Sequence, residues 1–130
     1  MRILLDGEQA IRVQAAGSGL EIESTDPAVT FSPLHMLAAS LGTCTIAVLA
    51  TWATQVGIGL EGLEIGLEWE YVDDPYRVGR YDMKLTWPEL PEERREAALR
   101  VAKHCTVEHT LQHPPEIEVS FADRGGDRRG

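Results

Sequence analysis

The longest apolar run of the chain predicts its central element. Residues 32–57 contain no Asp, Glu, Lys or Arg. Apolar residues recur there at intervals of three and four, and other apolar or small residues fill most remaining positions, so no broad polar face is left. Ser32 and Pro33 are typical of a helix start, and Gly57 is typical of a left-handed helix end. We therefore predict a helix that is buried on every side, with Cys44 near its middle.

Alternation of apolar and polar residues marks the strands. Residues 63–72 alternate with a period of two, and residues 77–87 return after a turn at 73–76, so together they predict a long antiparallel hairpin. A further alternating run at 116–121 predicts a last strand. Shorter runs at the start of the chain predict a small antiparallel sheet: Arg2–Leu5, Ala10–Ala15 and Leu20–Ser24.

Helical periodicity returns after the hairpin. Residues 92–104 carry acidic side chains first and basic ones later, as the helix dipole prefers, and their apolar face places Cys105 on the buried side. Residues 106–113 extend the helical pattern as far as two consecutive prolines. The chain thus predicts an α+β fold in a single domain, residues 1–122, followed by a flexible polar tail, residues 123–130.

Charge and composition limit the classes of binding partner and the cellular location that the sequence favours. The 130-residue chain has a formal net charge of −9, which disfavours nucleic acid and anionic membrane surfaces. The uncharged stretch 28–60 is long enough to span a bilayer, but polar residues dilute it and no basic flank adjoins it. The N-terminal apolar run meets Asp6 too early for a secretory signal. We therefore expect a cytoplasmic protein with reduced cysteines and no membrane partner.

Two cysteine motifs carry a family resemblance. Ser32-Pro33 is followed by Cys44 within LAASLGTC, and the pattern AAL-x-x-A-x-x-C ends at Cys105, before Thr106-Val107. With the order of elements, the sequence resembles the family of osmotically inducible protein C (OsmC) and the organic hydroperoxide resistance proteins, over nearly its whole length. The resemblance implies an intertwined homodimer, with antiparallel sheets around a buried central helix.

The resemblance also implies an activity. In active members the first cysteine attacks a hydroperoxide as a thiolate, becomes a sulfenic acid, and is trapped by the second cysteine as a disulfide. Carried over, Cys44 is the peroxidatic residue and Cys105 the resolving residue. The implied protein is a stress-response hydroperoxide reductase that acts on small organic hydroperoxides. It needs no bound cofactor or metal, and a dithiol protein of lipoyl type would reduce it.

One part of the family pattern is missing. Peroxide-reducing members carry a Glu shortly after the helix-starting Pro and an Arg from the N-terminal region, which together activate the nucleophile. Here Leu34 and His35 stand where that Glu would be, and Arg12 is the N-terminal arginine nearest the right part of the fold. We therefore expect a weak peroxidase in which His35 or Arg12 assists Cys44. Without a strong cation, the pKa of Cys44 should stay near the ordinary thiol value of ~8.5.

Two alternatives to a peroxidase remain. Cys105, His109 and His113 fall at four-residue intervals, so on a continuing helix they would share one face and could bind zinc or copper. The other alternative is a non-catalytic dimer of the same fold that binds an apolar ligand between its helices. Metal content after purification and a thiol titration with peroxide distinguish these functions.

Overall fold

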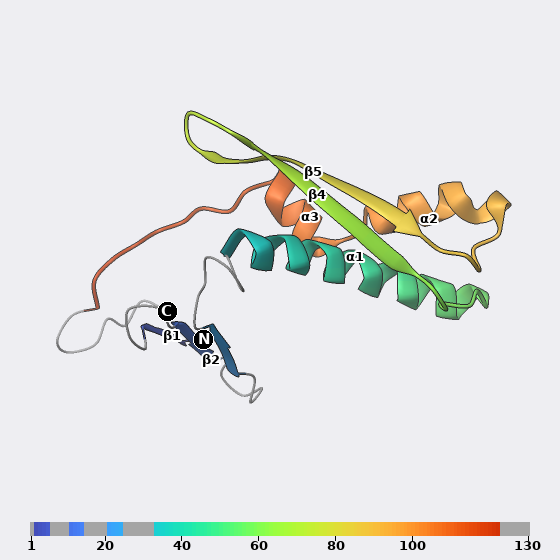
Figure 1. Ribbon diagram of the computed structural model, residues 1–130, viewed down its shortest axis with the longest axis horizontal. Coiled ribbons are helices and arrows are strands. Elements are labelled where there is room, and N and C mark those ends of the chain that lie inside the picture. The colour runs from blue at the N-terminus through green and yellow to red at the C-terminus, as the bar shows by residue number, and fades with distance from the viewer. Residues whose placement is uncertain (1, 6–10, 15–20, 25–32, 123–130) are drawn as a thin grey trace.

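A small antiparallel sheet opens the chain. The computed structural model in Figure 1 describes residues 2–5, 11–14, 21–24 and 33–122. The first three strands pair in the order β1-β2-β3, with bounds β1 Arg2–Leu5, β2 Ile11–Gln14 and β3 Glu21–Ser24. Their register pairs Arg12 with Leu4 and Glu23, which confirms the predicted opening sheet. The predicted tail, 123–130, lies outside the described residues.

The central helix α1 (Pro33–Val56) begins and ends where the sequence predicts. Pro33 occupies its first position, and Gly57 follows its end with a φ of 74°, in the left-handed region that favours glycine. Its buried residues lie along one side: Ala38, Leu41, Thr45, Leu49 and Ala53. The prediction of burial on every side is therefore wrong for the single chain, because the described residues cover only this side.

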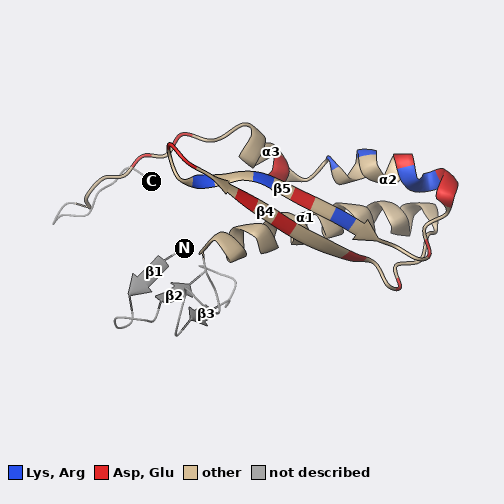
Figure 2. Cartoon of the chain, turned by 45° about the horizontal axis from the view of Figure 1, so that its top comes forward, with Lys and Arg blue, Asp and Glu red and all other residues tan. Residues whose placement is uncertain are grey.

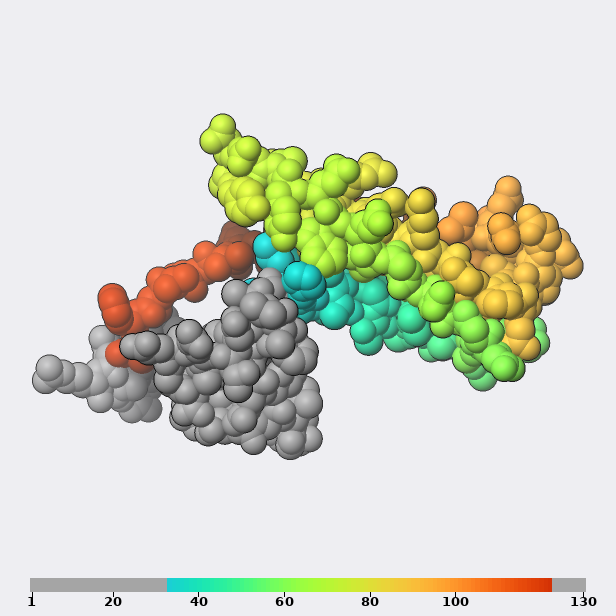
Figure 3. All heavy atoms as spheres, in the orientation of Figure 1, coloured from blue at the N-terminus to red at the C-terminus, as the bar shows by residue number. Residues whose placement is uncertain are grey.

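The predicted hairpin follows α1. Strands β4 (Glu64–Val72) and β5 (Arg77–Thr86) pair antiparallel, with one irregularity between Glu70 and Tyr71. The register places Leu67 opposite Met83. Figures 1 and 3 show the hairpin lying along α1, and the half-buried residues of the two strands alternate with exposed ones. The period-two pattern thus separates half-buried positions from exposed ones, and Figure 2 shows charged residues recurring along both strands.

The C-terminal half contains two helices where the sequence pattern predicted a nearly continuous one. A short 3-10 turn η1 (Glu92–Arg94) leads into α2 (Arg95–Ala102), and α3 (Thr106–Gln112) begins directly after Cys105. Both α2 and α3 pack against α1. A core cluster joins α1, α2 and the end of the hairpin: Leu49, Ala53, Trp87 and Ala98. The central helix is thus the element on which the second half of the chain packs.

The predicted last strand has no pairing partner among the described residues. Ile117, Val119 and Phe121 are 85%, 90% and 95% exposed, although their alternation with polar residues is that of a half-buried strand. Figure 3 shows the end of the described chain, in orange-red, running away from α1 and the hairpin. A sequence pattern built for a sheet is therefore left uncovered in the single chain.

Candidate functional site

The structure brings the two cysteines together. Cys44 lies in the middle of α1, and Cys105 lies at the N-terminal cap of α3. Both are free thiols, and each side chain is close enough to shift the pKa of the other. The break between α2 and α3 produces this contact, because it turns the start of α3 toward the middle of α1. Two thiols in contact can be linked by oxidation.

Cys105 is held as a neutral thiol. Its side chain is completely buried, its Sγ accepts a hydrogen bond from the Glu108 N–H at 3.4 Å, and it lies 4.0 Å from the Leu41 carbonyl oxygen. Its backbone is extended, as is usual for a residue that caps a helix N-terminus. Burial raises the pKa of Cys105, and the hydrogen bond to Cys44 raises it further.

Cys44 has the opposite environment. Its side chain is half-buried and meets the first turn of α3. The hydrogen bond from the Cys105 thiol lowers the pKa of Cys44 most, and the Val107 N–H lowers it next, while burial opposes them and the Thr106 N–H adds a smaller contribution. These amides are donors that a helix start leaves unpaired. Neutral donors thus lower the pKa of Cys44 without a cation, and the prediction that this pKa stays near the ordinary thiol value remains to be tested.

Thr45 is a buried polar residue beside the pair, and sequence reasoning did not identify it. It is 1% exposed, and its Oγ1 donates to the Leu41 carbonyl at 3.0 Å and lies 3.8 Å from Met83 Sδ. Its hydroxyl is also within hydrogen-bonding reach of Cys105, which lowers the pKa of that thiol and so opposes the effect of burial. Helical spacing could have identified Thr45, because it directly follows Cys44 and lies one turn after Leu41, on the buried side of the helix.

Of the two proposed activating residues, His35 is described in full, and it does not meet Cys44. His35 lies about two and a half turns before Cys44 on α1, so the two side chains leave opposite sides of the helix. The His35 ring packs edge-on against Trp69, with ring centroids 5.0 Å apart. The prediction that His35 assists Cys44 is therefore wrong within one chain. Arg12 lies in β2, but its side chain is outside the described part, so its role stays a prediction.

The surroundings of the three residues do not favour the metal alternative. The helix it needs is present, since α3 lies between Cys105 at its N-cap and His113 at its C-cap, but Cys105 is completely buried while His109 and His113 are exposed. His109 Nε2 lies 2.8 Å from the Lys103 carbonyl oxygen, and His113 Nδ1 lies 3.2 Å from the His109 carbonyl oxygen. Within residues 33–122, no three His, Cys, Asp or Glu side chains gather as metal ligands would.

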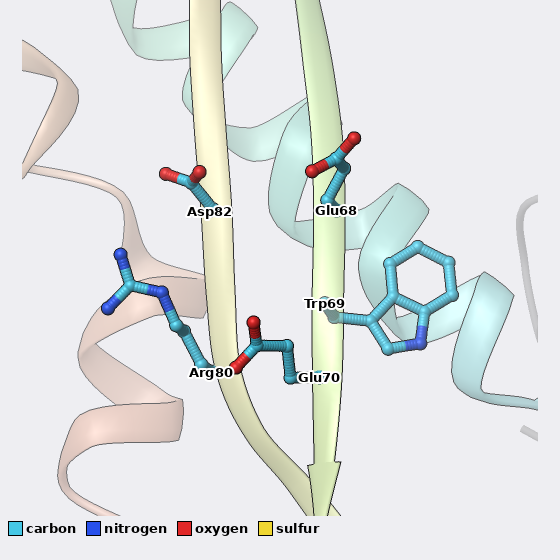
Figure 4. A pocket seen from close by; sticks show the side chains of 5 residues that line it. All are labelled: Glu68, Trp69, Glu70, Arg80 and Asp82. Atoms are coloured by element: carbon cyan, nitrogen blue, oxygen red, sulfur yellow. The ribbon is translucent and has the colours of Figure 1, made fainter.

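A separate hollow of about 410 Å³ lies on the outer face of the hairpin (Figure 4). Glu68 lies opposite Asp82, and Glu70 lies opposite Arg80. Two carboxylates directly opposite each other are unfavourable unless water solvates them. Figure 4 shows Trp69 pointing to the other side of the strand. We read this hollow as a solvated charged surface, distinct from the thiol pair.

Fold and site together define a class: an α+β protein with two facing thiols, one on a central helix and one at the start of a short helix. The sequence model for OsmC-like proteins matches residues 24–120, so the chain belongs to the OsmC-like protein family. That family is associated with peroxidase activity and the stress response. No curated protein matches the sequence.

Solved structures share the fold. A protein of Psychrobacter arcticus 273-4, named for osmotic stress induction and a detoxification response, has 22% identity, a TM-score of 0.74, and coverage of 84% of this chain and 85% of its own. A hypothetical protein of Aquifex aeolicus VF5 has 14% identity and a TM-score of 0.71, with coverage of 87% of this chain and 86% of its own. An OsmC-like protein of Mycoplasma pneumoniae has 20% identity and a TM-score of 0.68, with coverage of 87% of this chain and 86% of its own.

The central helix has the length and composition of a membrane span. By hydropathy alone α1 could cross a bilayer, but the core helix of a soluble protein passes the same test. Here α1 packs against the hairpin, α2 and α3, and OsmC-like proteins are soluble. The helix therefore gives no reason to assign the protein to a membrane.

Proposed function

We propose that this protein is a thiol-dependent peroxidase that reduces organic hydroperoxides through Cys44 and Cys105. The observation that carries the proposal is the contact of two thiols with opposite pKa shifts in an OsmC-like fold. The half-buried thiol favours the thiolate, which is the nucleophile, and the buried thiol stays protonated. The detoxification response in the name of the Psychrobacter protein is in keeping with this chemistry.

In the first step, the Cys44 thiolate attacks the distal oxygen of the hydroperoxide. A sulfur–oxygen bond forms while the O–O bond breaks, so Cys44 becomes a sulfenic acid and the organic part leaves as an alkoxide that takes up a proton. The Thr106 and Val107 amides and the Cys105 thiol hold the negative charge on Cys44 before the attack. The nucleophile is thus prepared by hydrogen bonds rather than by a neighbouring cation.

In the second step, Cys105 attacks the sulfenic sulfur of Cys44. Cys105 loses its proton, a disulfide forms, and the sulfenic oxygen leaves as water. An external dithiol then exchanges with the disulfide, restores both thiols and becomes a disulfide itself. A lipoyl-type dithiol is our proposed reductant, and we propose a cytoplasmic stress response as the setting.

We further propose that the protein acts as an intertwined homodimer. The uncovered side of α1 is rich in small and apolar residues without formal charge, and the exposed run 116–121 has the alternation of a strand with one buried face. Both features are explained if a second copy covers them in a closed, symmetric assembly. The single chain leaves these surfaces open to water.

A thiol titration with cumene hydroperoxide tests the proposed activity. In the reduced wild-type protein, one equivalent of hydroperoxide should consume both thiols and yield one equivalent of alcohol and one disulfide. The Cys44→Ser variant should not consume the hydroperoxide on this time scale. A non-catalytic binder would keep its two thiols while it takes up the apolar compound, and that result would overturn the proposal.

A further inference from the structure

A groove between β5 and α2 is a second candidate binding site. It encloses about 370 Å³, which is within the size range of small-molecule sites. Its floor is apolar and comes from the end of the hairpin and from α2: Leu85, Trp87, Leu90, Ala98 and Leu99. Neither cysteine lines it. The groove is therefore distinct from the thiol pair, and the inference drawn from it goes beyond the proposed function.

Two cationic side chains line the same groove. Lys84 comes from β5 and Arg95 from the first turn of α2. In the hairpin register, Lys84 lies opposite Gly66, and it also lines a neighbouring hollow together with Glu68 and Asp82. Arg95 Nε lies 3.0 Å from Glu92 Oε2, but both side chains are mostly exposed, so water and salt screen this pair. The groove thus combines an apolar floor with two exposed cationic side chains.

We propose that this groove binds a medium-chain carboxylate. The acyl chain would lie on the apolar floor, and the carboxylate would lie between Lys84 and Arg95, where it would compete with Glu92 for the Arg95 guanidinium. Each buried CH₂ should raise the affinity about fourfold, so octanoate, with two more CH₂ groups, should bind about sixteenfold more tightly than hexanoate. The charge contacts select an acid over the alcohol of equal length.

Trp87 reports occupancy of the groove. It is 8% exposed, its Nε1 donates to the Gly59 carbonyl at 2.8 Å, and its indole lines the floor. A ligand against this ring should shift the indole N–H resonance of Trp87 in an NMR titration. The Trp87→Phe variant identifies that resonance.

Calorimetry of the full-length protein with octanoate and octanol tests the proposal at 150 mM salt. Octanoate should bind with one site per chain, shift the Trp87 resonance, and exceed octanol in affinity. Lys84→Gln and Arg95→Gln should each weaken octanoate about threefold and leave octanol unchanged. Glu92→Gln should strengthen octanoate about twofold, because it frees the guanidinium. Lys103→Gln, at the other end of α2, is the matched control and should change little.

Three results would overturn the proposal. They are equal affinity for octanoate and octanol, octanoate binding that leaves the Trp87 resonance in place, and octanoate binding that is insensitive to both Lys84 and Arg95. The titration is repeated with Cys44→Ser, which keeps the groove but lacks the proposed nucleophile. Binding by that variant shows that the site stands even if the peroxidase proposal fails.

Discussion

The ionisation of Cys44 depends on a few hydrogen bonds from one turn of helix. Two backbone amides and the Cys105 thiol lower its pKa, and burial acts in the opposite direction. Sequence reasoning predicted both cysteines and their separate elements, because each lies in a recognisable motif. It did not predict the amide donors, because backbone N–H groups leave no trace in a residue pattern until the start of α3 is placed in space.

The first prediction concerns the pH dependence of Cys44. Because the pKa of Cys44 is lowered, iodoacetamide alkylation should reach half its maximal rate at a lower pH than it does for an unperturbed thiol, and the rate should fall as pH drops through that pKa. Cys105→Ala removes the side-chain donor and should move the half-point to higher pH. Cys105→Ser keeps a hydroxyl donor and should move it less. Superimposable profiles for the two variants would show that Cys105 does not supply the stabilising hydrogen bond.

The second prediction separates the roles of the two cysteines. Cys105→Ser should reduce one equivalent of hydroperoxide and stop, leaving a sulfenic acid on Cys44 that excess peroxide oxidises further. Mass spectrometry should find one added oxygen on the Cys44 peptide, and more after longer exposure. Multiple turnovers by this variant with a dithiol reductant would refute the resolving role. Cys44→Ser provides the inactive baseline.

At the scale of elements, the break before α3 decides what the site can be. The helical period continues from residue 92 to 113, so the pattern alone gave one face shared by Cys105, His109 and His113. Cys105 instead adopts an extended backbone and caps α3 with its sulfur. Cysteine is not among the residues that usually signal a helix start, and the break was therefore invisible to sequence rules.

Other elements were predicted closely. The bounds of α1 and of the hairpin follow from Pro33, Gly57 and the period-two alternation, which are local signals. Within the single chain only one side of α1 is buried, because burial depends on which segments pack on each side of a helix, and an apolar composition does not identify those segments.

The third prediction tests Thr45 as a positioning residue. Thr45→Val keeps the shape but removes the hydroxyl that lies beside Leu41 and Cys105, so the pKa of Cys105 should rise further. Oxidation of Cys44 should keep its rate, while disulfide formation near neutral pH slows several-fold and recovers as pH rises. Loss of one hydrogen bond should lower stability by about 1 kcal/mol.

The matched control for this variant is Thr51→Val. Thr51 Oγ1 also donates to a carbonyl one turn earlier, that of Ala47 at 3.0 Å, but it is exposed and far from the cysteines along α1. Stopped-flow kinetics that separate the two steps should give the same two rates for Thr51→Val as for the wild-type protein. Equal slowing of both steps in Thr45→Val would indicate a general packing defect instead.

At the scale of the whole molecule, the fourth prediction concerns assembly. Sedimentation should give twice the 14.4 kDa mass of the chain, because a second copy would cover the open side of α1 and residues 116–121. Ile117→Glu and Phe121→Glu place charge on the apolar face of that run and should weaken the dimer. Glu118→Lys, on its polar face, is the control. A stable monomer at micromolar concentration would contradict the prediction.

The mutual influence of the two thiols also sets the order of the proposed reaction. Burial raises the pKa of Cys105 most, and the hydrogen bond to Cys44 and the negative charge on Cys44 raise it further. Once Cys44 has taken an oxygen atom, that charge is gone, and the second sulfur ionises more readily than before. Cys105 therefore stays protonated as long as Cys44 is a thiolate, and it loses its proton more readily after the first oxidation. The peroxide thus prepares the resolving thiol for the second step by oxidising the first.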